Sequence, residues 1–191
     1  MAATAATVPT VYRFTRDAYY RMGEAGLFVD KRVELLDGEI ITMAPQNPPH
    51  AGATGHLTSL LVRLLGATFS VRIQLPIVLD DWSEPEPDVA ICRLDPDDYM
   101  RAHPKAGDVL LVIEVAEASL SYDRSGKVAA YAGSGIPVYW IVNLVDRRIE
   151  ALSDPDSAAR RYRTEKHAVA GDMLQLPGGV LLAAADILPR Y

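Results

Sequence analysis

The chain has 191 residues, of which 49% are hydrophobic and 23% are charged, and its formal net charge is −6 at pH 7. This length and composition are typical of a globular domain that buries a substantial core. The net negative charge argues against a broadly basic nucleic-acid binder, since neutralising phosphates requires Lys and Arg.

Three further features limit the classes to which the protein can belong. The only cysteine, Cys92, lies in an apolar run, which excludes a disulfide framework and favours a reducing, cytoplasmic environment. The N-terminal MAATAATVPT has no basic region and no long apolar core, so it is not a signal peptide. Residues 128–145 are uncharged but are interrupted by Gly, Pro and Asn, so we expect no membrane span. We expect a flexible tail over residues 1–10 and a single domain over 11–191.

The first part of the chain predicts a helix, a hairpin and a second helix. Thr15 is a suitable N-cap for a helix that ends near Gly26. Alternating polar and apolar residues on both sides of Asp37-Gly38 predict a β-hairpin. A leucine stripe with helical spacing predicts an amphipathic helix, and it comprises Leu57, Leu60, Leu61, Leu64 and Leu65.

The remainder predicts a mixed sheet. Residues 70–79 read as a strand with Val71, Ile73 and Leu75 on one face, and 87–93 as another. VLLVIEV and VYWIVNLV are apolar on both faces, which is typical of central strands, and a helix over 125–134 separates them. These two strands should therefore lie parallel. We expect an α/β fold, bordering on α+β, with helices flanking the sheet and acids at one end of it.

Two carboxylates stand where buried strands normally carry aliphatic residues. Asp88 follows Pro87 at the head of one strand, and Glu114 lies within VLLVIEV. An unpaired buried carboxylate is costly, so each must be paired or bind a cation. Mg²⁺ prefers oxygen ligands, and Asp88, Glu114 and the backbone carbonyl of Val115 could supply them. The alternatives are a turn acid for Asp88 and a salt-bridged strand end for Glu114.

A lysine on the following helix could complete such a site. Asp123, Lys127 and Tyr131 have four-residue spacing and share one helix face. Lys127 could stabilise charge on an attacked phosphate or activate the attacking water. The alternative is an exposed ion pair between Lys127 and Asp123, which would contribute little.

Four sequence blocks together resemble a known family. They are PEPDVAIC, VIEVAEAS, the D-x-x-x-K-x-x-x-Y start of the helix, and IPVYWIVN. In this order they resemble the Uma-type restriction endonucleases, a branch of the PD-(D/E)XK nuclease superfamily, over residues 12 to 190. The resemblance implies a restriction-endonuclease-like fold and Mg²⁺-dependent hydrolysis of DNA, with Mn²⁺ as a possible substitute.

The resemblance also implies roles for individual residues. Asp88 matches the PD aspartate and Glu114 the (D/E) position, whereas Ala116 stands where the superfamily has its lysine. Lys127 is then the expected catalytic substitute, which reaches the site from the helix. Glu34 matches an acid of the family pattern and could be an extra ligand or an orienting group; otherwise it is a solvated hairpin acid.

The other secondary candidates are His50, Asp123 and Tyr131. His50 could contact a phosphate or a base, or else cap a helix, and Tyr131 could pack or hydrogen-bond near Lys127. By analogy with nucleases that cut two strands, we expect a homodimer.

Three functions remain open from the sequence. The first is a Mg²⁺-dependent endonuclease acting on DNA. The second is a catalytically inactive binding or assembly module of the same fold, which the negative charge and Ala116 favour. The third is a metal-dependent hydrolase of another phosphate ester.

Overall fold

The structure, a computed structural model, describes residues 10–188. The predicted tail of residues 1–10 therefore lies, apart from Thr10, outside the described residues. Among the helices within 10–188, none combines the length and the apolar character that spanning a membrane requires.

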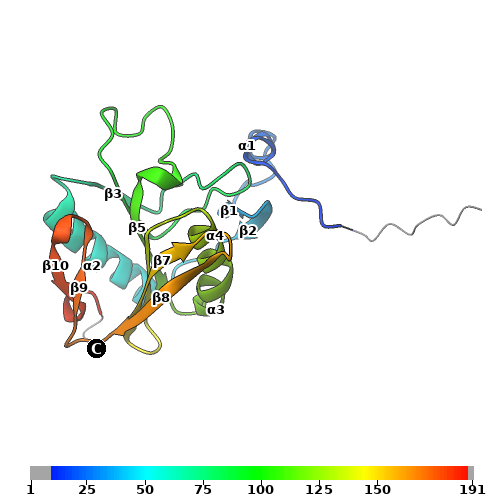
Figure 1. Cartoon of the computed structure of the whole chain (residues 1–191). Helices are drawn as coiled ribbons and strands as arrows, with labels where there is room; N and C mark the ends of the chain where they lie inside the picture. Colours follow the sequence, from blue (N-terminus) through cyan, green and yellow to red (C-terminus); the bar gives the residue numbers. More distant parts are fainter. Residues whose placement is uncertain (1–9, 189–191) are drawn as a thin grey trace, which may run out of the picture.

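The α-helices all lie before residue 134, interspersed with strands, and the remainder of the described chain forms strands and short turns (Figure 1). The helices are α1 (Arg16–Glu24), α2 (Pro48–Leu65), α3 (Leu120–Tyr122) and α4 (Val128–Gly133), with a π-helical turn, Asp123–Lys127, joining α3 to α4. The strands are β1 (Val33–Leu36), β2 (Glu39–Thr42), β3 (Ser70–Ile73), β4 (Val89–Cys92), β5 (Val109–Ala116), β6 (Val138–Asn143), β7 (Arg148–Asp156), β8 (Arg161–Ala168), β9 (Met173–Gln175) and β10 (Leu181–Ala183). Short 3₁₀ turns occupy Ala106–Asp108, Pro177–Gly179 and Ala184–Asp186.

The described residues form a six-stranded sheet in the order β3-β4-β5-β6-β7-β8. Strands β5 and β6 are parallel, and every other neighbouring pair in this sheet is antiparallel. The predicted mixed sheet is confirmed, as is the parallel pairing inferred from the helix between two apolar strands. β1 pairs with β2, and β9 with β10, in separate hairpins.

Each face of the sheet packs against its own layer. On one face, the buried leucines of α2 and of the β9–β10 hairpin pack with residues such as Ile113 and Trp140. Leu64, which the predicted stripe of α2 included, is instead 41% exposed. On the other face, Tyr131 of α4 packs with Val112 and Ile141. Because β5 is covered on both sides, its near-continuous apolar sequence is what burial requires. Glu114 points to the α3–α4 side, since it shares the parity of Val112.

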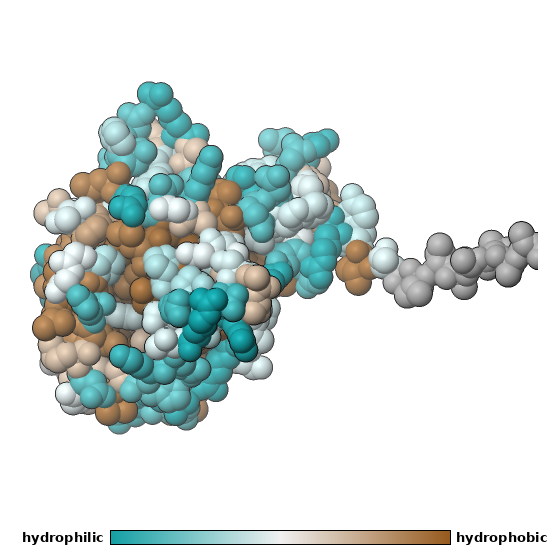
Figure 2. Space-filling view, in the orientation of Figure 1, coloured by the Kyte–Doolittle hydropathy of each residue, from teal (hydrophilic) through white to brown (hydrophobic). Residues whose placement is uncertain are grey.

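The predicted turns and caps of the N-terminal region are confirmed. Thr15 caps α1 by accepting a hydrogen bond from the backbone of Ala18 at 3.2 Å. Asp37 and Gly38 both have positive φ, as the tight turn of a two-residue hairpin requires. A side chain at Gly38 would also meet Cβ of Arg13 at 2.5 Å. Figure 2 shows that the surface over α1 is mostly hydrophilic.

Two predicted boundaries are wrong. The strand expected over residues 70–79 ends at Ile73, because Gln74 adopts a left-handed backbone with φ of 51°. Leu75, placed on the core face by alternation, is consequently 44% exposed. The helix expected over 125–134 begins at Leu120, because the polar segment before Ser125 continues it through the π-helical turn.

Candidate active site

A cavity of about 400 Å³ lies where the β1–β2 hairpin, the start of α2, and the strands β4 and β5 meet the helical segment after β5. Most of the predicted site residues line it: Glu34, His50, Asp88, Glu114, Val115, Asp123 and Lys127. Tyr131 is fully buried behind them. The structure thus brings together residues that lie up to 93 positions apart in the sequence.

Asp88 and Glu114 hold each other through backbone hydrogen bonds. The amide of Asp88 donates to Oε2 of Glu114 at 3.0 Å, and the amide of Val115 donates to Oδ2 of Asp88 at 2.9 Å. This exchange arises because β4 and β5 are antiparallel neighbours and both side chains project from the same face. The two carboxylates are therefore fixed at one end of the strand pair.

Asp88 has two further partners. Nε2 of Gln74 donates to Oδ1 at 3.1 Å, and Nε2 of His50 lies 3.1 Å from Oδ2. Although burial alone would raise the pKa of Asp88, the hydrogen bond from His50 and its charge lower it overall. The same hydrogen bond raises the pKa of His50, against the opposing effect of burial. Asp88 is thus held ionised.

Sequence reasoning missed Gln74. Its left-handed backbone ends β3 beside Asp88 and directs its amide to the carboxylate. Its polar side chain inside the predicted strand 70–79 indicated an irregular position. However, the alternation of polar and apolar residues does not predict a left-handed backbone.

Lys127 lies between two buried carboxylates. Its Nζ is 2.7 Å from Oε2 of Glu34 and 3.2 Å from Oε1 of Glu114, and the residue is 5% exposed. The alternative of an exposed pair with Asp123 does not hold. Burial lowers the pKa of Lys127, but Glu114 and Glu34 outweigh this effect and raise the pKa above its usual value. Lys127 is therefore a cation in the folded protein.

Glu114 also accepts a hydrogen bond from the hydroxyl of Tyr131 at 2.8 Å. Burial raises the pKa of Glu114 to about 8, with neighbouring carboxylates adding to the rise and Lys127 opposing it. The effect of burying the carboxylate on its pKa therefore outweighs the opposing effect of Lys127.

Glu34 and Asp123 are buried beside this pair. Glu34 accepts a hydrogen bond from the amide of Glu86 at 3.0 Å, so it is not a solvated hairpin acid. Asp123 accepts one from Oγ of Ser119 at 2.6 Å, and burial raises its pKa to about 6. The π-helical turn brings both Asp123 and Lys127 into the buried interior.

This donor set fits a divalent cation. Its buried carboxylates outnumber the cations Lys127 and His50, and they are Glu34, Asp88, Glu114 and Asp123. A bound divalent cation would favour the ionised form of Glu114, whose pKa is raised by burial and by the neighbouring carboxylates. Oxygen ligands of this kind suit Mg²⁺ or Mn²⁺. His50 also hydrogen-bonds the backbone of Val115, so it touches two of the groups predicted to bind the metal.

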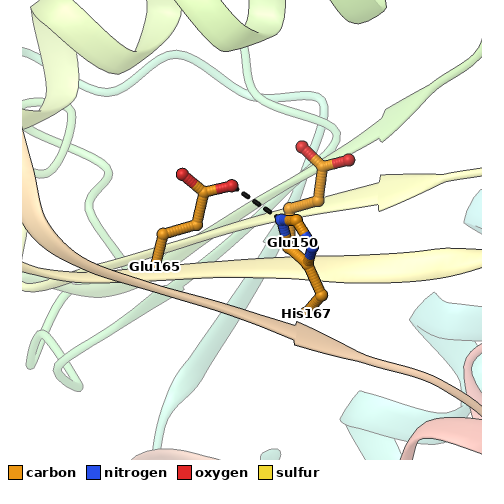
Figure 3. Close-up of side chains that lie close together, drawn as sticks. All are labelled: Glu150, Glu165 and His167. Carbon is orange, nitrogen blue, oxygen red and sulfur yellow. Dashed lines mark hydrogen bonds and ion pairs between the residues drawn. The ribbon is translucent and has the colours of Figure 1, made fainter.

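A second group of ligand atoms lies elsewhere, on β7 and β8. Glu150, Glu165 and His167 place atoms within 4.8 Å of one another (Figure 3). However, Glu150 already accepts hydrogen bonds from two guanidinium groups, those of Arg124 and Arg148. A metal ion there would have to displace these cations or lie beside them. We therefore interpret this group as a structural ion-pair network.

The fold and the cavity define an α/β protein with a mixed sheet flanked by helices and with buried carboxylates at one end of adjacent strands. The chain belongs to the Uma2 family, described as "Putative restriction endonuclease", whose model matches residues 17–185. No curated protein matches the chain.

A solved structure shares the fold. It is a "putative nuclease belonging to DUF820" from Anabaena variabilis, with a TM-score of 0.67 and 10% sequence identity. The match covers 91% of this chain and 97% of that one. The predicted α/β fold with a mixed sheet flanked by helices is thus confirmed.

Proposed function

We propose that this chain is a Mg²⁺-dependent endonuclease that hydrolyses phosphodiester bonds in DNA. The observation that carries the proposal is the convergence of Asp88, Glu114 and Lys127 in one cavity. Membership of a family described as restriction endonucleases supports it, as does the nuclease description of the solved neighbour.

In this proposal each residue has a distinct role. Asp88, Glu114 and the backbone carbonyl of Val115 would hold Mg²⁺ or Mn²⁺, which when bound supplies an activated water and polarises the phosphate. Lys127 would stabilise negative charge on the attacked phosphate. Because Lys127 lies 2.7 Å from Glu34, that carboxylate would orient the ammonium group.

The test is metal binding and DNA cleavage in matched variants. We expect Glu114→Gln to lose Mn²⁺ binding in calorimetry, and Asp88→Ala to lose Mn²⁺-dependent cleavage of DNA, assayed on a plasmid and on a single-stranded oligonucleotide. Glu165→Gln is the control, since it removes a carboxylate from the group on β8 and should leave both properties unchanged. Cleavage that persists in Asp88→Ala would contradict the assignment.

The same experiment separates the other functions. A protein that binds no metal at millimolar Mg²⁺ and leaves DNA intact would be a binding or assembly module, for which Ala116 is the motivating feature. Metal binding with hydrolysis of nucleotides, but not of DNA, would indicate a hydrolase of another phosphate ester.

A cytoplasmic location and a homodimer belong to this proposal. The free thiol of Cys92 is fully buried, which suits a reducing compartment. A C₂ dimer is the commonest arrangement of soluble oligomers, and sedimentation would test it.

A further inference from the structure

The cavity has an apolar wall that the proposed chemistry does not use. Besides the carboxylates and Lys127, its lining includes the apolar residues Ile41, Met43 and Pro45 and the aromatic residue Tyr122, which we call the apolar wall. Hydrolysis of a phosphate requires none of these. Nucleobases stack on aromatic side chains, so an aromatic ring among apolar side chains is a suitable surface for a base.

The two carboxylates proposed to hold the metal are almost fully buried, which disfavours contact with the backbone of an intact duplex. Asp88 is 9% exposed and Glu114 is 6% exposed. The cavity volume, about 400 Å³, is at the lower end of the roughly 300–1,000 Å³ typical of small-molecule pockets. A space of this size is suited to a small ligand or a single unit of a polymer rather than to a length of duplex.

The charges around the cavity also disfavour a duplex. Each cationic side chain that lines it is already paired with a carboxylate: Arg32 with Glu86 at 3.2 Å, His50 with Asp88, and Lys127 with Glu34. Binding of duplex DNA relies on Lys and Arg that neutralise phosphates. At this site, the affinity has to come from the metal and from contacts with bases.

A hydrogen bond joins two residues that line the cavity, Asn47 and Glu117. Nδ2 of Asn47 donates to Oε2 of Glu117 at 2.6 Å, which joins the segment before α2 to the segment after β5. Asn47 is fixed in this position because its Oδ1 also caps α2 through the amide of His50. The contact holds a further carboxylate, that of Glu117, in the lining of the cavity.

We propose that the substrate of this site is single-stranded DNA, with the base next to the cleaved phosphate stacked on Tyr122. The inference rests on the proposed nuclease function for the identity of the polymer. An unpaired strand can turn its base to the apolar wall while its phosphate reaches Asp88 and Glu114. A paired strand would first have to break its base pair.

Binding without cleavage tests the inference directly. A fluorescein-labelled mixed-sequence oligodeoxynucleotide, alone or annealed to its complement, is titrated with protein in Ca²⁺ and followed by fluorescence anisotropy. We expect the single strand to bind at least about tenfold more tightly than the duplex, since loss of stacking contacts changes affinity on that order. Equal or tighter duplex binding, or no binding of either DNA, would overturn the inference.

Variants of Tyr122 locate the contact. Tyr122→Ala should lower the affinity for the single strand about tenfold, whereas Tyr122→Phe keeps the ring and should bind like the wild type. Tyr12→Ala is the matched control, because Tyr12 is 77% exposed and does not line the cavity. An unchanged affinity in a folded Tyr122→Ala protein would overturn the stacking role.

Cleavage in Mn²⁺ distinguishes this inference from the proposed function. Preferential cleavage of the single strand supports both. Preferential binding of the single strand with no cleavage of either DNA supports the inference and contradicts the nuclease. Cleavage of the duplex at an equal or higher rate supports the nuclease and overturns the single-strand inference.

Discussion

The Nζ atom of Lys127 lies 2.7 Å from a carboxylate oxygen of Glu34 and 3.2 Å from one of Glu114, and the residue is almost fully buried. Removing one partner from a buried ion pair leaves the other charge uncompensated, which typically costs about 3–5 kcal/mol. We therefore expect Lys127→Met to lower the free energy of unfolding by about that amount. Urea denaturation followed by circular dichroism measures it.

A compensating variant separates charge from packing. In the double variant Glu34→Gln/Lys127→Met, part of the lost stability should return, because a neutral amide replaces the unpaired carboxylate. Lys166→Met, at an exposed position of β8, is the control and should change stability by less than about 0.5 kcal/mol. A loss below about 1 kcal/mol in Lys127→Met would show that the ion pair contributes little.

The residues of the site differed in how far the sequence could reveal them. Asp88 and Glu114 were visible because a carboxylate within an apolar run is an anomaly that requires a partner. The four-residue spacing of Asp123 and Lys127 predicted that their side chains lie on one face of a helix. The pairing of Lys127 with Glu34 could not be read from the sequence, since it depends on how the hairpin packs against the helix.

At the scale of elements, the helical segment after β5 contributes several residues to the candidate site. Its π-helical turn brings Asp123 and Lys127 into the interior, and Gly126 within the turn packs against the ring of Tyr122. A methyl group at Gly126 would lie 2.7 Å from that ring. Any substitution here must therefore move Tyr122, which lines the cavity.

We expect Gly126→Ala to affect ligand binding more than stability. The gain in helix propensity, about 1 kcal/mol, offsets much of the crowding against a movable ring. Stability should therefore change by less than about 1 kcal/mol, while the affinity for single-stranded DNA falls several-fold. Denaturation and anisotropy measure the two effects.

A helical glycine in open space is the matched control. A methyl group added at Gly55 of α2 would meet no atom within 4 Å, so Gly55→Ala should stabilise the protein and leave DNA binding unchanged. If Gly126→Ala binds DNA like the wild type, Tyr122 is not the contact we infer.

The elements also show where local sequence patterns are sufficient to predict the structure. Asp37-Gly38 predicted its hairpin because both residues tolerate positive φ. The parallel pairing of β5 with β6 followed from the helix between them. Alternation failed after Ile73, since the left-handed turn at Gln74 is stabilised by contacts with the distant Asp88. The π-helical turn was equally hidden, because residues four apart share a face in an ordinary helix as well.

At the scale of the whole molecule, Glu150 joins the sheet to the helical layer. It lies on β7, is 2% exposed, and accepts hydrogen bonds from Arg124 after α3, Asn143 of β6 and Arg148. Burial alone would raise its pKa, but these three partners outweigh burial and lower it to about 2. Its ionised form is therefore favoured in the folded protein.

The lowered pKa of Glu150 predicts how the stability of the protein depends on pH. A carboxylate whose pKa is lower in the folded state stabilises the protein fully above its unfolded pKa, near 4.5, and loses that contribution as the pH falls to about 2. Each pKa unit corresponds to about 1.4 kcal/mol. Because Arg124 and Arg148 are 39% and 30% exposed, we expect roughly 2 kcal/mol to be lost, less than the full shift implies.

The measurement is the urea midpoint between pH 2 and pH 6 in the wild type and in Glu150→Gln. The variant should be less stable than the wild type at pH 6, because two guanidinium groups lose their carboxylate, and the difference should shrink toward pH 2. Glu165→Gln, which changes an exposed acid on the adjacent strand, should follow the wild type throughout. A Glu150→Gln curve parallel to that of the wild type would show that the acid sensitivity of the fold arises at other carboxylates.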